Sequence, residues 1–162
     1  MLSCKTKARR DTLKTMKPEH DIPFEKYFVA AKAVVLDEEG RMLTLLRGQT
    51  APANPLHWDL PGGIVEYGED LETCVVRETQ EEAAIAIDSL RVFHAVARMN
   101  SIGEFWTTIF YAARAASLDV RISWEHDEFR WIVPEEFLDL KISARQREAV
   151  QLLLARKPDG KI

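Results

Sequence analysis

The sequence is poor in cysteine, with only Cys4 and Cys74 among its 162 residues. One lies in a polar N-terminal stretch and the other within an expected helix, so they do not form the disulfide framework of a small secreted protein. No apolar run approaches the roughly 18 residues that a membrane-spanning helix needs, and the N-terminus lacks the apolar core of a signal peptide. These absences indicate reduced thiols, no membrane association and a cytoplasmic location.

The sequence also has no excess of positively charged residues. The net charge of -4 argues against non-specific nucleic-acid binding as the main role, so no stable nucleic-acid partner is expected. Residues 1–20 nevertheless hold six Lys and Arg against two acids. We interpret residues 1–26 as a basic N-terminal tail with a short helix near residues 8–16, residues 27–158 as one domain and residues 159–162 as a C-terminal tail. A transit peptide is the weaker reading of the acid-free first ten residues, because Asp11 follows at once.

Residues 62–85, GGIVEYGEDLETCVVRETQEEAAI, join a glycine turn to a helix. Two adjacent glycines let the backbone turn sharply and approach another group closely. No Gly or Pro occurs between residues 70 and 84, which predicts a helix of about four turns. At about 100° per residue, its inward stripe begins with Leu71, Cys74 and Val75.

Glu78, Glu81 and Glu82 continue this inward stripe. The usual interpretation of an acidic cluster is a solvated helix face, but that face is expected to carry Thr73, Arg77, Gln80 and Ala84. Glutamates three and four residues apart repel one another, and partial burial increases the cost unless cations offset it. Hard divalent ions with oxygen ligands meet this need, so the cluster predicts a metal site.

The same segment resembles the Nudix box, G-x5-E-x7-R-E-U-x-E-E-x-G-U, in which U is a bulky apolar residue. Its positions are occupied here by Gly63, Glu69, Arg77, Glu78, Glu81, Glu82 and Ile85. The preceding Trp58–Gly62, WDLPG, is also typical of the family. Thr79 stands where the pattern has an apolar residue, and Ala84 stands where it has a glycine. We expect these two departures to affect the packing under the helix and the shape of its C-terminal turn.

The resemblance implies an α/β protein, a Nudix α/β/α sandwich with a mixed β-sheet flanked by helices. It further implies a hydrolase that uses Mg²⁺ or Mn²⁺ to cleave a nucleoside diphosphate linked to another group. Metal ligands are then expected from Glu78, Glu81, Glu82 and a backbone carbonyl of Gly62 or Gly63. Glu69 and Arg77 are expected to pair and to tie the loop to the helix.

Further roles are implied outside the helix. Arg47 and Gly62 are candidate contacts to the substrate, and an ordinary surface arginine is the alternative interpretation of Arg47. The general base stays open between Glu81, Glu82 and two acids near a later strand, Glu125 and Glu128. His126 lies among these acids, which are expected to raise its pKa towards protonation.

The remaining pattern predicts strands at residues 27–36, 41–47, 57–60, 91–99, 104–114 and 129–133. Asp88 and Ser89 are expected to break the chain after the helix, and residues 125–128 to form an acidic loop. A short turn or helix is expected at residues 134–137. A last helix is capped by Ser143, with Gln146 completing a capping box and Ala149, Val150, Leu153 and Leu154 packing on the sheet.

Two other functions remain open at this stage. A catalytically silent nucleotide-binding or regulatory module on the Nudix fold is the main alternative, although all the box carboxylates are present. A diphosphate isomerase needs a reactive cysteine, whereas Cys74 is expected to be buried and inert. A nucleoside triphosphate or nucleotide-sugar is the default substrate, and a homodimer is expected from the family alone.

Overall fold

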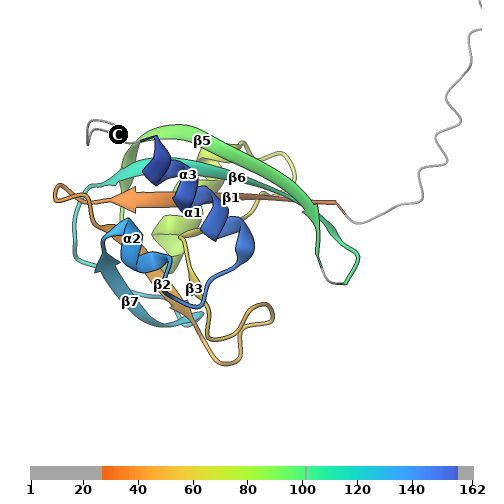
Figure 1. The fold of residues 1–162 in the computed structure, drawn as a ribbon, viewed down its shortest axis with the longest axis horizontal. Helices are drawn as coiled ribbons and strands as arrows, with labels where there is room; N and C mark the ends of the chain where they lie inside the picture. Colours follow the sequence, from red (N-terminus) through yellow and green to blue (C-terminus); the bar gives the residue numbers. More distant parts are fainter. Residues whose placement is uncertain (1–26, 101, 157–162) are drawn as a thin grey trace, which may run out of the picture.

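A mixed sheet organises the computed structural model, which describes residues 27–100 and 102–156 (Figure 1). Its strand order is β3-β2-β1-β6-β5, and β1 and β6 run parallel while the other pairs are antiparallel. These strands are β1 (Tyr27–Leu36), β2 (Met42–Arg47), β3 (Trp58–Asp59), β5 (Ile87–Met99) and β6 (Phe105–Ala115). Two more strands join outside this path: β4 (Gly62–Ile64) pairs with β1, and β7 (His126–Ile132) pairs with β2.

One edge of β1 is shared between two strands. Its first half pairs with β4 through residues 30–32, while Leu36 at its end pairs with β2. Between these partners, the N–H of Ala33 donates to the carbonyl of Pro61 at 2.8 Å. The segment that carries the glycine pair therefore enters the sheet where β2 and β4 separate.

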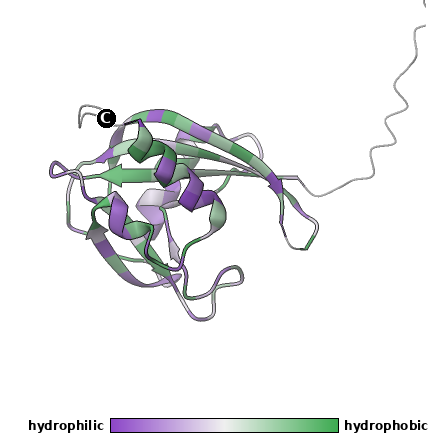
Figure 2. Cartoon of the chain, in the orientation of Figure 1, coloured by the Kyte–Doolittle hydropathy of each residue, from purple (hydrophilic) through white to green (hydrophobic). Residues whose placement is uncertain are grey.

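Helices cover both faces of the sheet, as Figures 1 and 2 show. One core cluster lies between the sheet and α1 (Leu71–Ala83), and includes Cys74 and Val75. The other lies under α2 (Pro134–Phe137) and α3 (Ala144–Ala155). It includes Phe137, Ala149, Val150 and Leu153, with Leu154 partly buried against it. The predicted α/β/α sandwich is confirmed.

The helix termini follow local sequence signals. Asp70 caps α1 by accepting from the N–H groups of Glu72 and Thr73, and Ser143 caps α3 by accepting from the N–H of Gln146. The reciprocal half of the predicted capping box does not form, because the Gln146 amide donates to Asp59. Ala84 ends α1 in the left-handed conformation (φ 56°), which the glycine of the family pattern adopts more easily.

Two strand boundaries differ from the prediction. Asp88 and Ser89 do not break the chain but lie inside β5, where Ser89 has a φ of 55° and the register with β6 shifts. At such an irregularity, turn-favouring residues can lie within a strand that continues on both sides of them. Likewise, β7 begins at His126 rather than Phe129, so Asp127 and Glu128 are strand residues. The predicted helix near residues 8–16 and both tails beyond residues 27–156 lie outside the described residues.

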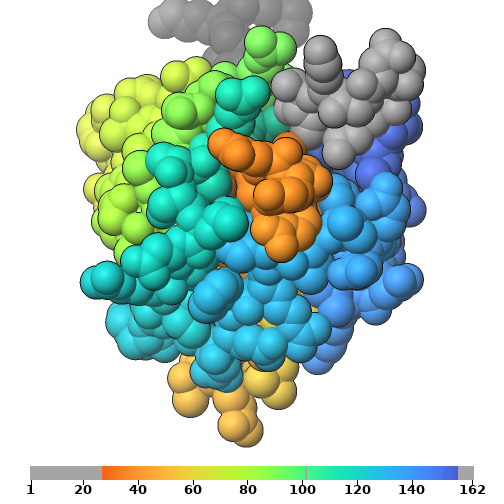
Figure 3. Space-filling view, turned by 90° about the vertical axis from the view of Figure 1, so that its left-hand side faces the viewer, coloured from red at the N-terminus to blue at the C-terminus, as the bar shows by residue number. Residues whose placement is uncertain are grey.

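The β1–β2 turn marks the end of the sheet remote from the glycine pair. Gly40 takes a φ of 78° there, as its place in the hairpin requires, and its N–H donates to the carbonyl of Asp37. Figure 3 shows this turn in orange, between the segment after β6 in cyan and the α2 region in blue. A hollow of about 1120 Å³ at this end is lined by residues 36–40, 88–91, 112–115 and 133–135, and none of its described lining comes from α1.

Candidate functional site

The glycine pair sits directly against β1. Gly62 has a φ of 126°, and a Cβ there would lie 2.1 Å from the carbonyl oxygen of Ala31. A Cβ on Gly63 would lie 2.3 Å from the carboxylate of Glu78. Both positions therefore require the absence of a side chain, one for the close approach of two strands and the other to seat a carboxylate.

Glu82 is the most enclosed of the three predicted metal ligands. It is 6% exposed, and its Oε2 accepts from the N–H of Gly62 at 2.8 Å. Burial raises the pKa of Glu82 to about 7, against the opposing effect of the Lys32 ammonium. This carboxylate faces the glycine segment, as the inward stripe of α1 predicted.

Glu78 and Glu81 are less enclosed. Glu78 is half-buried against Gly63, and burial raises its pKa while Arg77 opposes the shift. The prediction that Glu81 continues the buried stripe is wrong, because 59% of its side chain is exposed. It lies at the edge of the stripe, where the helix surface turns towards solvent.

Arg77 connects these acids to the loop before α1. Its Nε and Nη2 donate to the two carboxylate oxygens of Glu69 at 2.8 and 3.0 Å, which is the predicted pair. Its Nη1 donates to Glu78 at 2.9 Å and to Glu81 at 3.2 Å. The pairing holds the pKa of Glu69 down at about 2, so that this carboxylate stays ionised.

The carboxylates of α1 are suited to a hard cation but do not all converge. Among residues 27–100 and 102–156 there is no group of three or more His, Cys, Asp or Glu side chains arranged as a metal cage. Arg77 instead forms ion pairs with Glu78 and with the exposed Glu81. Glu78 and Glu82 nevertheless present oxygen atoms against the glycine pair. Burial raises the pKa of both carboxylates, and a dication beside them would offset the cost of keeping them ionised there.

A buried charge cluster lies beside the glycine segment and was not anticipated from the sequence. Asp59 forms ion pairs at 3.2 Å with Lys32 and with Arg47. Lys32 also donates to the carbonyl of Leu60 at 3.0 Å, and the Gln146 amide donates to Asp59. A single lysine within the apolar run AAKAVV was the signal that could have indicated a buried partner.

Arg47, the candidate substrate contact, lies in this cluster at the end of β2. Its Nε donates to the carbonyl of Ala53 at 2.8 Å, and its Nη1 pairs with Asp59. The guanidinium is therefore held in place at the point where β2 and β4 separate.

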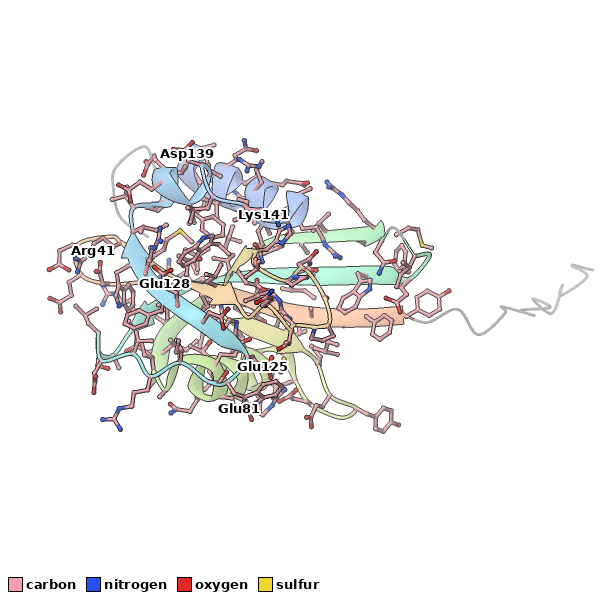
Figure 4. All side chains as sticks on the ribbon, turned by 90° about the horizontal axis from the view of Figure 1, so that it is seen from below. Arg41, Glu81, Glu125, Glu128, Asp139 and Lys141 are labelled. Carbon is pink, nitrogen blue, oxygen red and sulfur yellow. The ribbon has the colours of Figure 1, made fainter. Side chains whose placement is uncertain are left out.

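The two loop acids are placed differently from each other. Glu125 precedes β7, and Figure 4 shows it at the end of β7 that lies near α1 and Glu81. Glu128 pairs with Arg130 at 2.8 Å, and Arg130 stacks on Trp58 of the core under α3. Since Glu128 and Arg130 share one face of the strand, the structure does not bring Glu128 to Glu78 and Glu82.

The expectation for His126 is wrong. Its side chain is fully buried, and burial lowers its pKa to about 4 despite the opposing effect of Asp59. Its Nε2 lies 3.8 Å from Oε1 of Glu82. The acids next to it in the sequence are exposed to water, whereas the desolvation of the imidazole acts on it directly.

The NUDIX domain family model matches residues 26–153. The chain belongs to the Nudix family. The matched residues include the glycine pair, α1 and β7.

Named relatives agree with this assignment. The Nudix chain is 29% identical over 134 residues to a MutT-like protein of Streptomyces ambofaciens, a match that spans 82% of this chain and 77% of that protein. It is 38% identical over 92 residues to the asymmetrical bis(5'-nucleosyl)-tetraphosphatase of Sus scrofa, spanning 52% of this chain and 60% of that enzyme. A crystal structure of the MutT protein from Methanosarcina mazei Go1 has a TM-score of 0.75, with 26% identity over 84% of this chain and 99% of the other.

These matches make the chain a Nudix-type phosphohydrolase. The other enzymatic alternative, an isomerase, needs a reactive thiol. Cys74 is fully buried on the inner face of α1, as its place on the inward stripe predicted, and this burial raises the pKa of the thiol to about 11. In the part of the chain that the structure describes, no helix is both long enough and apolar enough to cross a membrane.

Proposed function

We propose that this Nudix chain hydrolyses the diphosphate linkage of a nucleoside diphosphate joined to a further group, in the presence of Mg²⁺ or Mn²⁺. A nucleoside triphosphate or a nucleotide-sugar is the default substrate. The observation that carries the proposal is the placement of the Glu78 and Glu82 carboxylates against the glycine pair. The nucleotide substrate named for the Sus scrofa relative supports it.

The ion would be held by Glu78 and Glu82, with Glu81 and the backbone carbonyl of Gly63 as the further ligands. A bound dication supplies charge neutralisation at the diphosphate and lowers the pKa of a coordinated water. Arg77 places the acids of this set, because it contacts both Glu78 and Glu81 while Glu69 holds it to the loop.

A separate group is needed to accept a proton from the attacking water. Glu81, Glu82 and Glu125 are the candidates that lie on the α1 side of the sheet, and Glu128, which pairs with Arg130 on the other side, is less favoured. Arg47 pairs with Asp59, three residues before Gly62 in the chain, and we propose that the Arg47 guanidinium and the backbone of Gly62 contact substrate phosphate.

The test incubates the protein with a panel of nucleoside triphosphates and nucleotide-sugars in the presence of Mg²⁺ or Mn²⁺. Hydrolysis is measured as the release of phosphate or pyrophosphate. Glu81→Gln and Glu82→Gln are each expected to lower the rate by at least about 10²-fold while the circular dichroism spectrum is kept. Glu72→Gln, an exposed glutamate of the same helix, is the matched control and is expected to leave the rate unchanged.

Two outcomes would contradict the proposal. Wild-type rates in both Glu81→Gln and Glu82→Gln would remove the carboxylates from the mechanism. Nucleotide binding without turnover of any compound would favour the catalytically silent module instead. A cytoplasmic location and a homodimer stay predictions.

A further inference from the structure

Trp124 leaves almost all of its indole in water. Of the four tryptophans, Trp58 packs beneath Arg130, Trp106 stacks on Phe28, and Trp131 packs against the α1-side core, whereas Trp124 is 87% exposed. An indole carries a large apolar surface that folding usually removes from water. An exposed tryptophan on a structured part of the chain is therefore a candidate for binding a ligand.

The backbone around Trp124 is held by a turn. The N–H of His126 donates to the carbonyl of Ser123 at 3.2 Å, so Trp124 and Glu125 occupy the two central positions of a four-residue turn. His126 anchors the end of the turn, because its imidazole is fully buried next to Glu82. The indole thus projects from a fixed base and not from a free loop.

This turn also joins the two sides of the proposed site. On one side, the N–H of Ser123 donates to the backbone carbonyl of Glu82 at 3.0 Å. On the other, the N–H of Gly48, which follows Arg47, donates to the carbonyl of Glu125 at 2.8 Å. Trp124 therefore lies between a residue proposed to bind the metal and a residue proposed to contact phosphate. Figure 4 shows its neighbour Glu125 in this position at the start of β7.

We propose that Trp124 is the residue on which the nucleobase of the substrate stacks, an inference that rests on the proposed function. Every nucleobase has a flat π-face, and an indole offers the widest such surface among the side chains. Stacking of this kind tolerates different bases, so it selects for a nucleotide over an inorganic polyphosphate rather than for one particular base.

The kinetic test compares ATP with inorganic tripolyphosphate as substrates of the wild type, Trp124→Ala and Trp124→Phe. In Trp124→Ala the KM for ATP is expected to rise about tenfold with kcat nearly unchanged, while the KM for tripolyphosphate stays constant. Trp124→Phe keeps an aromatic face and is expected to restore most of the affinity. Ile102→Ala, which removes another highly exposed apolar side chain at the β5–β6 hairpin, is the control.

A second measurement separates this inference from the proposed function, because it needs no turnover. ATP is expected to quench the tryptophan fluorescence of the wild type more than tripolyphosphate does, and this difference is expected to vanish in Trp124→Phe. Equal quenching in the wild type and Trp124→Phe would overturn the inference even if ATP is hydrolysed. A loss of self-association in Trp124→Ala with unchanged KM values would also overturn it, since the indole would then be a protein contact.

Discussion

Asp59 lies where two buried cations meet, and replacing it with asparagine tests the charge cluster beside the glycine pair. Lys32 and Arg47 each approach its carboxylate to 3.2 Å, and the three side chains are only 11–15% exposed. Burial by itself would raise the pKa of Asp59, but the two cations outweigh it and hold the pKa below its ordinary value. Asp59→Asn keeps the shape and removes the charge.

The magnitude follows from the burial of the cations that remain. At an effective dielectric constant of about 20, each pair at this separation has a Coulomb attraction of about 5 kcal/mol, most of which offsets the desolvation of the charges. Removing one partner of such a pair costs about 3–5 kcal/mol, because the other charge is left buried and unpaired. With a urea dependence of about 1–3 kcal/mol per molar, the unfolding midpoint is expected to fall by more than about 1 M.

Urea unfolding followed by circular dichroism measures this difference directly. Glu128→Gln is the matched control, because Glu128 pairs with Arg130 at 2.8 Å but both side chains are 46% exposed. An exposed pair of this kind contributes less than about 1 kcal/mol. The reasoning is refuted if Asp59→Asn loses no more stability than Glu128→Gln does.

Three further predictions concern the glycine pair and the ends of α1. Gly63→Ala places a Cβ 2.3 Å from the movable Glu78 carboxylate, so we expect activity to fall at least about tenfold with the fold retained; unchanged kinetics would contradict this. The pKa of Glu69 is about 2 when folded, against 4.5 ordinarily, so its stabilising contribution is present above about pH 4.5 and lost as the pH falls towards 2. Glu69→Gln should therefore lower the urea midpoint at pH 7 but much less at pH 2.5, and an equal loss at both pH values would argue against the pair. Ala84→Gly removes the steric strain of an alanine in the left-handed conformation and should raise the free energy of unfolding by about 1 kcal/mol. A lower free energy of unfolding in this variant would show that the strain is absent.

Local sequence patterns were enough to predict most of the helices and strands and the family. Helical periodicity between residues 70 and 84, the strand-forming runs that become β1 and β6, and the cap at Ser143 are local patterns, and each of these elements appears in the structure. Glu69 and Arg77 are only eight positions apart and both belong to the Nudix box, which is why their pairing between the loop and α1 could be predicted. These features depend on residues that are close in the chain.

The tertiary structure alone decided which of these side chains meet and how deeply each is buried. Asp59 and Lys32 are 27 positions apart, and their pairing depends on β4 and β2 dividing one edge of β1. Whether Glu81 or Glu82 faces inwards depends on the rotation of α1 against the sheet, and the pKa of His126 depends on what covers it. Burial and ionisation are set by atoms from several distant segments, and no local pattern encodes them.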